Sequence, residues 1–132
     1  MNVSEDFPQD LLDLEAARVA ARREIDVYVR TVEVARRAAF PGPEQAVERG
    51  MWPDEQVQRW HELRAAYAVA AAAVKAHPVL VAAEAERRLW PVEEKLRGLV
   101  PQVEVFVRPD TAAGGEEVVV VLGGIEQHAS PV

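Results

Sequence analysis

Apolar residues recur at helical spacing in the first third of the chain. Over residues 8–39 they follow one another at steps of three, four or seven, the pattern of a helix with one buried face. The stripe consists of Leu11, Leu14, Ala21, Ile25, Tyr28, Val32, Ala35 and Ala39. Arg18 interrupts it at a position where an apolar residue is expected. The spacing predicts one long helix over residues 8–39, a length typical of helical hairpins and coiled coils.

Prolines and a glycine follow this helix at residues 40–43, read FPGP. Proline disfavours helix in the residue before it and cannot continue a helix itself. We therefore expect a connector over residues 40–52. Pro43 suits a first helical turn and Gly50 suits a helix end, so the connector should contain one or two helical turns.

A second amphipathic stripe begins after the connector, within a helical region predicted over residues 53–100. Its members are Val57, Trp60, Leu63, Tyr67, Ala70 and Val74. Residues 65–76 are mostly alanine, so a facing helix could approach to the short end of the usual ~8–10 Å range. Two interpretations stay open: packing inside the same subunit, or a self-complementary seam between two copies.

Pro78 interrupts this helical region. The apolar phase continues beyond it through Val81, Ala85 and Leu89. The helix could kink and continue, or it could restart with Pro78 in a new first turn. The preserved phase favours a nearly collinear continuation. Pro91 raises the same question again.

The C-terminal part changes to strand patterning. Val103, Val105 and Val107 alternate with polar or aromatic residues, and residues 116–122 read EEVVVVL. A turn-rich loop at residues 109–115 separates them, which predicts a β-hairpin over residues 103–122. Residues 118–122 are apolar toward both faces, which indicates burial on both faces or pairing across a subunit boundary.

Together these patterns predict a mainly α protein: a long antiparallel helical hairpin, its second arm kinked or split near Pro78, with a C-terminal β-hairpin. The length of 132 residues fits a single domain over residues 1–132. Residues 1–7 and 125–132 are expected to be flexible ends.

Composition narrows the possible partners. The formal net charge of -7 argues against non-specific binding to nucleic acid or to anionic membranes. The chain has no cysteine, no apolar secretory segment at its start and no run of ~18 apolar residues. We therefore expect a cytoplasmic protein that is not inserted in a membrane. The excess of arginine over lysine and the abundance of alanine and valine are typical of a high-GC bacterium.

Known catalytic and metal-binding patterns do not occur. His61-Glu62 lacks the second histidine four residues later that a zinc-protease motif needs. Paired Glu-x-x-His motifs and a glycine-rich phosphate loop are also missing. His77, just before Pro78, is interpreted as a helix-end residue. The sequence therefore nominates no catalytic residue, no cofactor and no metal ligand, and it favours a non-catalytic role.

Many charges can be explained by pairing along helices. Acids precede arginines at i,i+4 spacing, the favourable orientation, which predicts solvated outer faces. The pairs are Asp26–Arg30, Glu33–Arg37, Glu55–Arg59, Glu84–Arg88 and Glu93–Arg97. The arginines of the first helix form a local positive excess: Arg18, Arg22, Arg23, Arg30, Arg36 and Arg37. A DNA-binding regulator that uses these arginines is one alternative function.

The function favoured by the sequence is that of an interaction or structural protein that self-associates through its amphipathic helix faces. A homodimer is expected, and another protein is a possible partner. The predicted interface consists of Ile25, Tyr28, Val32, Trp60, Tyr67, Ala70, Val74 and Trp90. The other alternative is a small ligand-binding or catalytic helical domain, with a pocket between helices near Trp60 and Trp90 and lined also by Tyr67 and Arg64.

Overall fold

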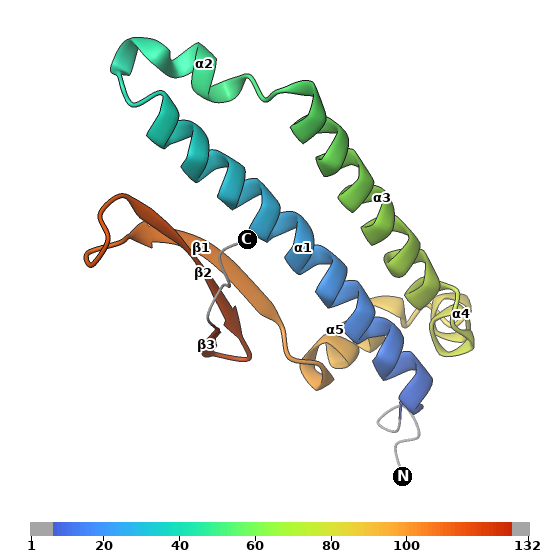
Figure 1. Ribbon diagram of the computed structural model, residues 1–132. Helices are drawn as coiled ribbons and strands as arrows, with labels where there is room; N and C mark the ends of the chain where they lie inside the picture. The colour runs from blue at the N-terminus through green and yellow to red at the C-terminus, as the bar shows by residue number, and fades with distance from the viewer. Residues whose placement is uncertain (1–6, 128–132) are drawn as a thin grey trace. The chain divides into compact units, whose positions relative to one another are not determined.

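The computed structural model describes residues 7–127, which form a set of helices followed by one antiparallel sheet (Figure 1). The elements are α1 (Gln9–Ala39), the short 3₁₀ helix η2 (Pro43–Gln45), α2 (Ala46–Gly50), α3 (Asp54–Lys75), α4 (Pro78–Ala85), α5 (Leu89–Leu99), β1 (Val103–Pro109), β2 (Glu116–Leu122) and β3 (Ile125–Gln127). The predicted mainly α fold, with its long helical hairpin, is confirmed. Helix α1 has 31 residues and is about 46 Å long.

The chain divides into two compact units. Within the described residues, unit 1 combines residues 7–22 with residues 65–102, and unit 2 combines residues 23–64 with residues 103–127. Helices α1 and α3 each contribute one part to unit 1 and another part to unit 2. The single domain expected from the chain length stays a prediction.

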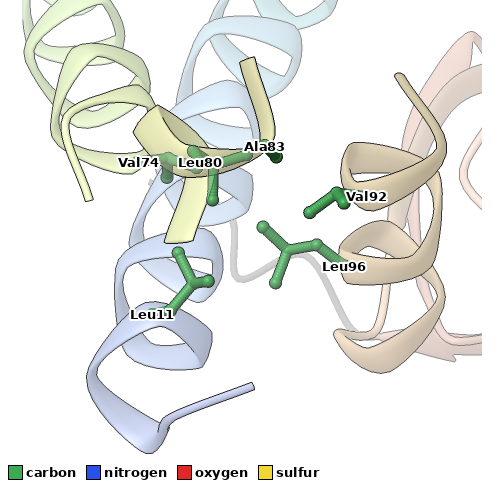
Figure 2. Packing of buried hydrophobic residues seen from close by; sticks show 6 residues of the cluster. All are labelled: Leu11, Val74, Leu80, Ala83, Val92 and Leu96. Carbon is green, nitrogen blue, oxygen red and sulfur yellow. The ribbon is translucent and has the colours of Figure 1, made fainter. Parts of the chain in front are cut away.

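Unit 1 is built on one cluster of buried apolar side chains (Figure 2), which consists of Leu11, Val74, Leu80, Ala83, Val92 and Leu96. The cluster takes members from all four helical segments of the unit, so none of these segments buries its apolar face alone. Phe7 also packs against it. This contact gives Phe7 apolar burial. The flexible start expected over residues 1–7 stays a prediction, and residues 1–6 lie outside the described part.

The second arm breaks at Pro78 and restarts in a new direction. Helix α3 ends at Lys75, α4 begins at Pro78, and the two helices are bent by 67°. Pro78 has no N–H to donate and lies in the first turn of α4, where none is needed. His77 caps this turn, because its Nδ1 accepts a hydrogen bond from the Val79 N–H at 3.1 Å.

The nearly collinear continuation favoured by the apolar phase is therefore wrong. Leu80 and Ala83 are each 1% exposed, whereas Val81, which lay in phase, is 53% exposed. The break rotates α4, so a different set of residues faces the core. The phase of a stripe says nothing about the direction of a helix once its hydrogen-bond ladder is interrupted.

Helix α4 ends in a left-handed cap at Arg87. The φ of Arg87 is 58°, the only positive φ of a residue other than glycine in the described range. The Arg88 N–H donates to the Ala83 carbonyl at 2.7 Å, and the Arg87 N–H donates to the Glu84 carbonyl at 3.0 Å. These two bonds form a Schellman motif, which usually has glycine at the position of Arg87. Pro91 then lies in the first turn of α5 and does not break that helix.

In unit 2 the predicted connector contains helical turns, as expected, and two arginines tie it to the end of α1. Arg36 donates from Nε to the Arg49 carbonyl at 3.0 Å and from Nη2 to the Glu48 carbonyl. Arg49 donates in return to the carbonyls of Phe40 at 2.7 Å and Gly42 at 2.6 Å. The exchange satisfies carbonyls that helix ends leave without partners.

The predicted hairpin forms the first two strands of a three-stranded sheet in the order β1-β2-β3. Val105 lies opposite Val120, and Phe106 lies opposite Val119. Val119 and Val120 are 3% and 0% exposed although neighbouring residues in a strand point to opposite faces. Burial of the central strand on both faces is confirmed.

The third strand was not predicted. Gly123 and Gly124 have φ values of 57° and 84°, and Leu122 pairs with Ile125 across them. Positive φ at both central residues makes this a two-residue turn of type I′, which favours a hairpin. Ile125–Gln127 thus pair with β2, although they were expected to belong to the tail over residues 125–132. The flexibility of that tail stays a prediction, and residues 128–132 lie outside the described part.

Within residues 7–127, no single helix is both long enough and apolar enough to cross a lipid bilayer. Helices α3 and α4 reach the required length and composition only when taken together, with the 67° bend between them.

Replacing Arg87 by glycine should stabilise the protein. Glycine adopts a positive φ without steric cost, so Arg87→Gly should raise the free energy of unfolding by about 1 kcal/mol. Thermal unfolding should show a Tm increase of about 3 °C. The matched control is Ala82→Gly inside α4, where glycine should cost about 1 kcal/mol. Two variants that shift Tm in the same direction would contradict the assigned cap.

Candidate functional site

Unit 1 contains a polar pocket of about 170 Å³ between α1, α3 and α5. Charged or hydroxyl-bearing side chains form much of its lining: Glu15, Arg18, Tyr67, Lys75, Glu93 and Arg97. Val74 and Leu96, which also belong to the apolar cluster of the unit, form part of its wall together with Ala71. The pocket therefore has both a hydrogen-bonding side and an apolar side.

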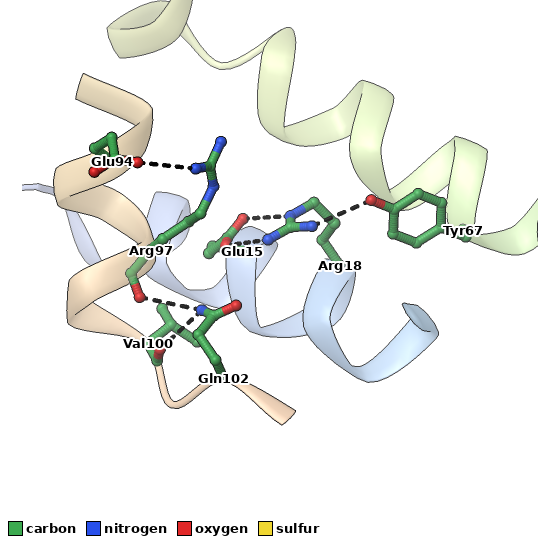
Figure 3. A network of polar contacts seen from close by, with 7 residues as sticks. All are labelled: Glu15, Arg18, Tyr67, Glu94, Arg97, Val100 and Gln102. Carbon is green, nitrogen blue, oxygen red and sulfur yellow. Dashed lines mark hydrogen bonds and ion pairs between the residues drawn. The ribbon is translucent and has the colours of Figure 1, made fainter. Parts of the chain in front are cut away.

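The inner wall of the pocket carries an ion pair within α1 (Figure 3). Arg18 donates to the two carboxylate oxygens of Glu15, from Nε at 2.7 Å and from Nη2 at 2.5 Å. Glu15 is 2% exposed, and the Arg18 side chain is 20% exposed. A bidentate pair of this kind has a defined geometry and satisfies both charges as water is removed.

Tyr67 of α3 extends this pair across the pocket. Its hydroxyl oxygen accepts a hydrogen bond from Nη1 of Arg18 at 3.2 Å (Figure 3). The hydrogen bonds that Arg18 donates to Glu15 raise the pKa of Arg18, partly offset by burial, so the guanidinium stays charged. Arg22 lies over the Tyr67 ring, 5.8 Å from its centroid, on the same helix as Arg18.

The side of the pocket formed by α5 is more loosely held. Arg97 contacts Glu94 at 3.4 Å, and both side chains are about half exposed, so the pair adds little stability. Gln102 donates to the carbonyls of Arg97 at 3.1 Å and Val100 at 3.0 Å, which closes the end of α5 (Figure 3). The backbone that carries Arg97 is therefore fixed, whereas its guanidinium can change partners.

Unit 2 contains a cluster of aromatic side chains around Trp52. Trp52 makes edge-to-face contacts with Tyr28 and Trp60, with ring centroids 6.3 Å apart in both pairs. Arg64 lies over the Trp60 ring at 4.7 Å. Trp60 therefore has an aromatic and a cationic neighbour.

The predicted interface residues are found in several environments. Ile25 and Val32 are buried in unit 2, where Tyr28 and Trp60 are half-buried. In unit 1, Val74 is buried and Tyr67 and Ala70 are half-buried. Trp90 is 68% exposed. The structure brings Tyr67 and Val74 together at the polar pocket and brings Tyr28 and Trp60 together around Trp52.

The ligand pocket expected near Trp60 and Trp90 stays a prediction. The polar pocket includes Tyr67 but none of Trp60, Arg64 and Trp90. Trp60 belongs to unit 2 and Trp90 to unit 1, since the boundary between the units lies between Arg64 and Ala65.

The arginines of α1 proposed for DNA binding all have partners within the chain. Arg18 binds Glu15, Arg23 contacts Glu24, Arg30 contacts Glu33 and Arg37 binds Glu116 of β2. Arg22 lies over Tyr67, and Arg36 binds carbonyls of α2. The local excess of positive charge seen in the sequence is thus largely compensated in the fold.

Several arginines contact a different acidic residue from the one predicted at i,i+4 spacing. Arg59 contacts Glu62 at 3.5 Å instead of Glu55, and Arg97 contacts Glu94 instead of Glu93. A residue three positions away is as close on a helix surface as one four positions away, so sequence spacing alone cannot choose between them.

The sequence pattern does not identify Glu15 as a site residue. It identifies Arg18 only as one of the arginines of the first helix. Arg18 did carry a signal, because it occupies a position of the apolar stripe where a charge must find a partner. Glu15 carried none, since an acid on a long helix is normally exposed.

Comparisons with known protein families, with curated proteins and with solved structures find no match to this chain. In the part of the chain that the structure describes, no group of three or more histidine, aspartate or glutamate side chains is placed to hold a metal ion.

Removing one member of the Glu15–Arg18 pair should destabilise unit 1. Glu15→Leu leaves Arg18 with an uncompensated charge; because Arg18 is partly exposed, we expect a cost of about 2 kcal/mol, below that of a fully buried pair. The double variant Glu15→Leu/Arg18→Leu should recover at least half of this loss. Urea unfolding of both single variants and the double variant gives the coupling energy. Purely additive effects would contradict a coupled pair.

Proposed function

We propose that this chain is a non-catalytic interaction protein that associates with a second copy of itself. The single observation that carries the proposal is the outer face of α3 in unit 1. Residues 65–74 include no charged side chain, yet Ala65, Ala66, Ala68, Val69 and Ala72 are exposed. Val69 is 72% exposed, the highest value among the large apolar residues described.

A helix face of this composition is unusual for a surface in contact with water. Surface helices carry polar and charged residues on the side away from the core, and helices that are apolar on all sides are normally buried. Helix α1 follows this rule, since it exposes Arg22, Glu24, Arg30 and Arg37. The outer face of α3 does not, so a contact that covers it would be favourable.

A second copy is the partner that this face fits best. Side chains as small as alanine let two helix backbones approach to about 8 Å. A two-fold axis places the same stripe on both sides of the contact, so one methyl-rich surface is matched by an identical one. The proposed interface therefore differs from the one predicted from the sequence. It uses the exposed residues Val69 and Ala72 in place of their neighbours Ala70 and Val74.

The size of the stripe limits the strength of such a dimer. The uncharged stripe spans residues 65–74, which corresponds to about 15 Å of helix. A contact of this length buries less than the ~800 Å² per partner of a standard stable interface. We therefore expect a concentration-dependent dimer with a Kd on the order of 10–100 µM.

Sedimentation velocity of the full chain from about 5 to about 500 µM should show the monomer converting to a dimer. Ala72→Glu should raise the Kd at least ~10-fold, because a two-fold contact brings two carboxylates together. The matched control is Ala16→Glu, the same substitution at an exposed alanine of α1, which should leave the Kd unchanged.

Two results would overturn the proposal. One is a wild-type protein that stays monomeric throughout this concentration range. The other is a monomer that floats with phosphatidylcholine vesicles and loses this property in Ala72→Glu, since the stripe would then contact lipid. Circular dichroism of each variant shows that the helices are retained.

A further inference from the structure

The polar pocket of unit 1 is independent of the outer face of α3, and its lining points to a ligand. Inside the pocket, the Glu15–Arg18 pair is already neutral and hydrogen-bonded. The polar side chains that remain available to contact a ligand are those of Tyr67, Lys75, Glu93 and Arg97.

Tyr67 presents a hydrogen-bond donor to the pocket. Its oxygen already accepts from Nη1 of Arg18 at 3.2 Å, and the acceptor role leaves the hydroxyl hydrogen to be donated elsewhere. Among the residues described, the Tyr67 hydroxyl donates no hydrogen bond to another side chain. The hydroxyl is held in place by Arg18 and therefore needs little reorganisation to donate.

The remaining charges of the pocket favour an anion. Lys75 and Arg97 supply two positive charges from two helices, against the single negative charge of Glu93. In the described part of the chain no ion pair holds Lys75, and the Arg97–Glu94 contact is long and exposed. Both cations can therefore turn toward a bound carboxylate at little cost.

The size and the apolar wall restrict the ligand further. A volume of about 170 Å³ is below the ~300 Å³ at which pockets for drug-sized molecules begin. Val74 and Leu96 provide an apolar surface beside the cationic groups. An inorganic anion would leave this surface uncovered, whereas a short aliphatic chain would bury it.

We propose that this pocket binds a small organic carboxylate with a short apolar tail. The carboxylate accepts hydrogen bonds from Lys75, Arg97 and the Tyr67 hydroxyl, and the tail contacts Val74 and Leu96. The buried Glu15–Arg18 pair does not contact the ligand's charge directly; it positions Tyr67. A ligand of about six heavy atoms in such a site should bind with a Kd on the order of 1 mM.

Butyrate is the probe. Sodium butyrate is titrated into the uniformly ¹⁵N-labelled full chain at constant ionic strength, with sodium chloride as the balancing salt. Saturable shifts are expected for the amides of Tyr67, Lys75 and Leu96, and no shifts are expected for Val120 of the sheet. Sodium phosphate should bind several-fold more weakly, and butylammonium should produce no saturable shifts.

Variants assign the binding to the named groups. Lys75→Gln and Arg97→Gln should each raise the Kd for butyrate at least ~5-fold, since each removes a charge-assisted hydrogen bond. Glu93→Gln should lower the Kd about 2-fold, because it removes the like charge. Arg59→Gln is the matched control for Arg97→Gln: both arginines contact a glutamate three residues away and have similar exposure, but Arg59 lies in unit 2.

Three outcomes would overturn the inference: shifts that grow linearly with butyrate up to about 50 mM, equal affinity for phosphate and butyrate, or a Kd that Lys75→Gln and Arg97→Gln leave unchanged. The amide spectrum of each variant shows directly whether the fold is intact. The same butyrate titration is repeated on the Ala72→Glu variant, in which self-association should be weaker. The comparison separates chemical-shift changes caused by butyrate from those caused by self-association.

Discussion

The interruption of the second helical arm at His77 and Pro78 is the constraint on which unit 1 depends. Pro78 cannot donate to the preceding turn, and the His77 ring supplies the cap that starts the next helix. Because Nδ1 of His77 accepts from Val79, the proton of the neutral ring is on Nε2, which lies 3.0 Å from Asp10 at the start of α1. The turn therefore joins three helices.

The change of direction has two consequences. It brings Leu80 and Ala83 of α4 onto Leu11 and Val74, so the apolar cluster of unit 1 can close. It also lets α5 lie beside the parts of α1 and α3 that carry Glu15 and Tyr67, which creates the polar pocket. A straight second arm would have left those groups facing solvent, where a pair such as Glu15 and Arg18 contributes little.

Helix α3 has different surroundings on its two sides, and this difference supports two separate proposals. Its inner side contributes Tyr67 and Val74 to the pocket and the core. Its outer side presents exposed alanine and valine without charge. The spacing of apolar residues in the sequence identifies only the inner side, because alanine occurs in both buried and exposed positions.

Local patterns in the sequence determined the long helix α1, the helical turns of the connector, the second helical arm and the hairpin of β1 and β2. Each of these depends on neighbours within a few residues, such as Pro43, the alternating valines of β1 or the apolar stripe along α1. The turn at Gly123 and Gly124 is also a local signal, because two adjacent glycines favour a two-residue hairpin turn.

Only the tertiary structure decided the direction taken after Pro78, the partners of the arginines and the place of the pocket. A proline interrupts the hydrogen-bond ladder without specifying the angle of the next helix, and an arginine side chain reaches several acids at similar cost. Glu15 and Tyr67 are 52 residues apart in sequence, and their approach follows from the packing of the apolar cluster rather than from any spacing. The sequence patterns thus specify the helices and strands. The burial of Leu11, Leu80 and Leu96 specifies where the helices of unit 1 pack together.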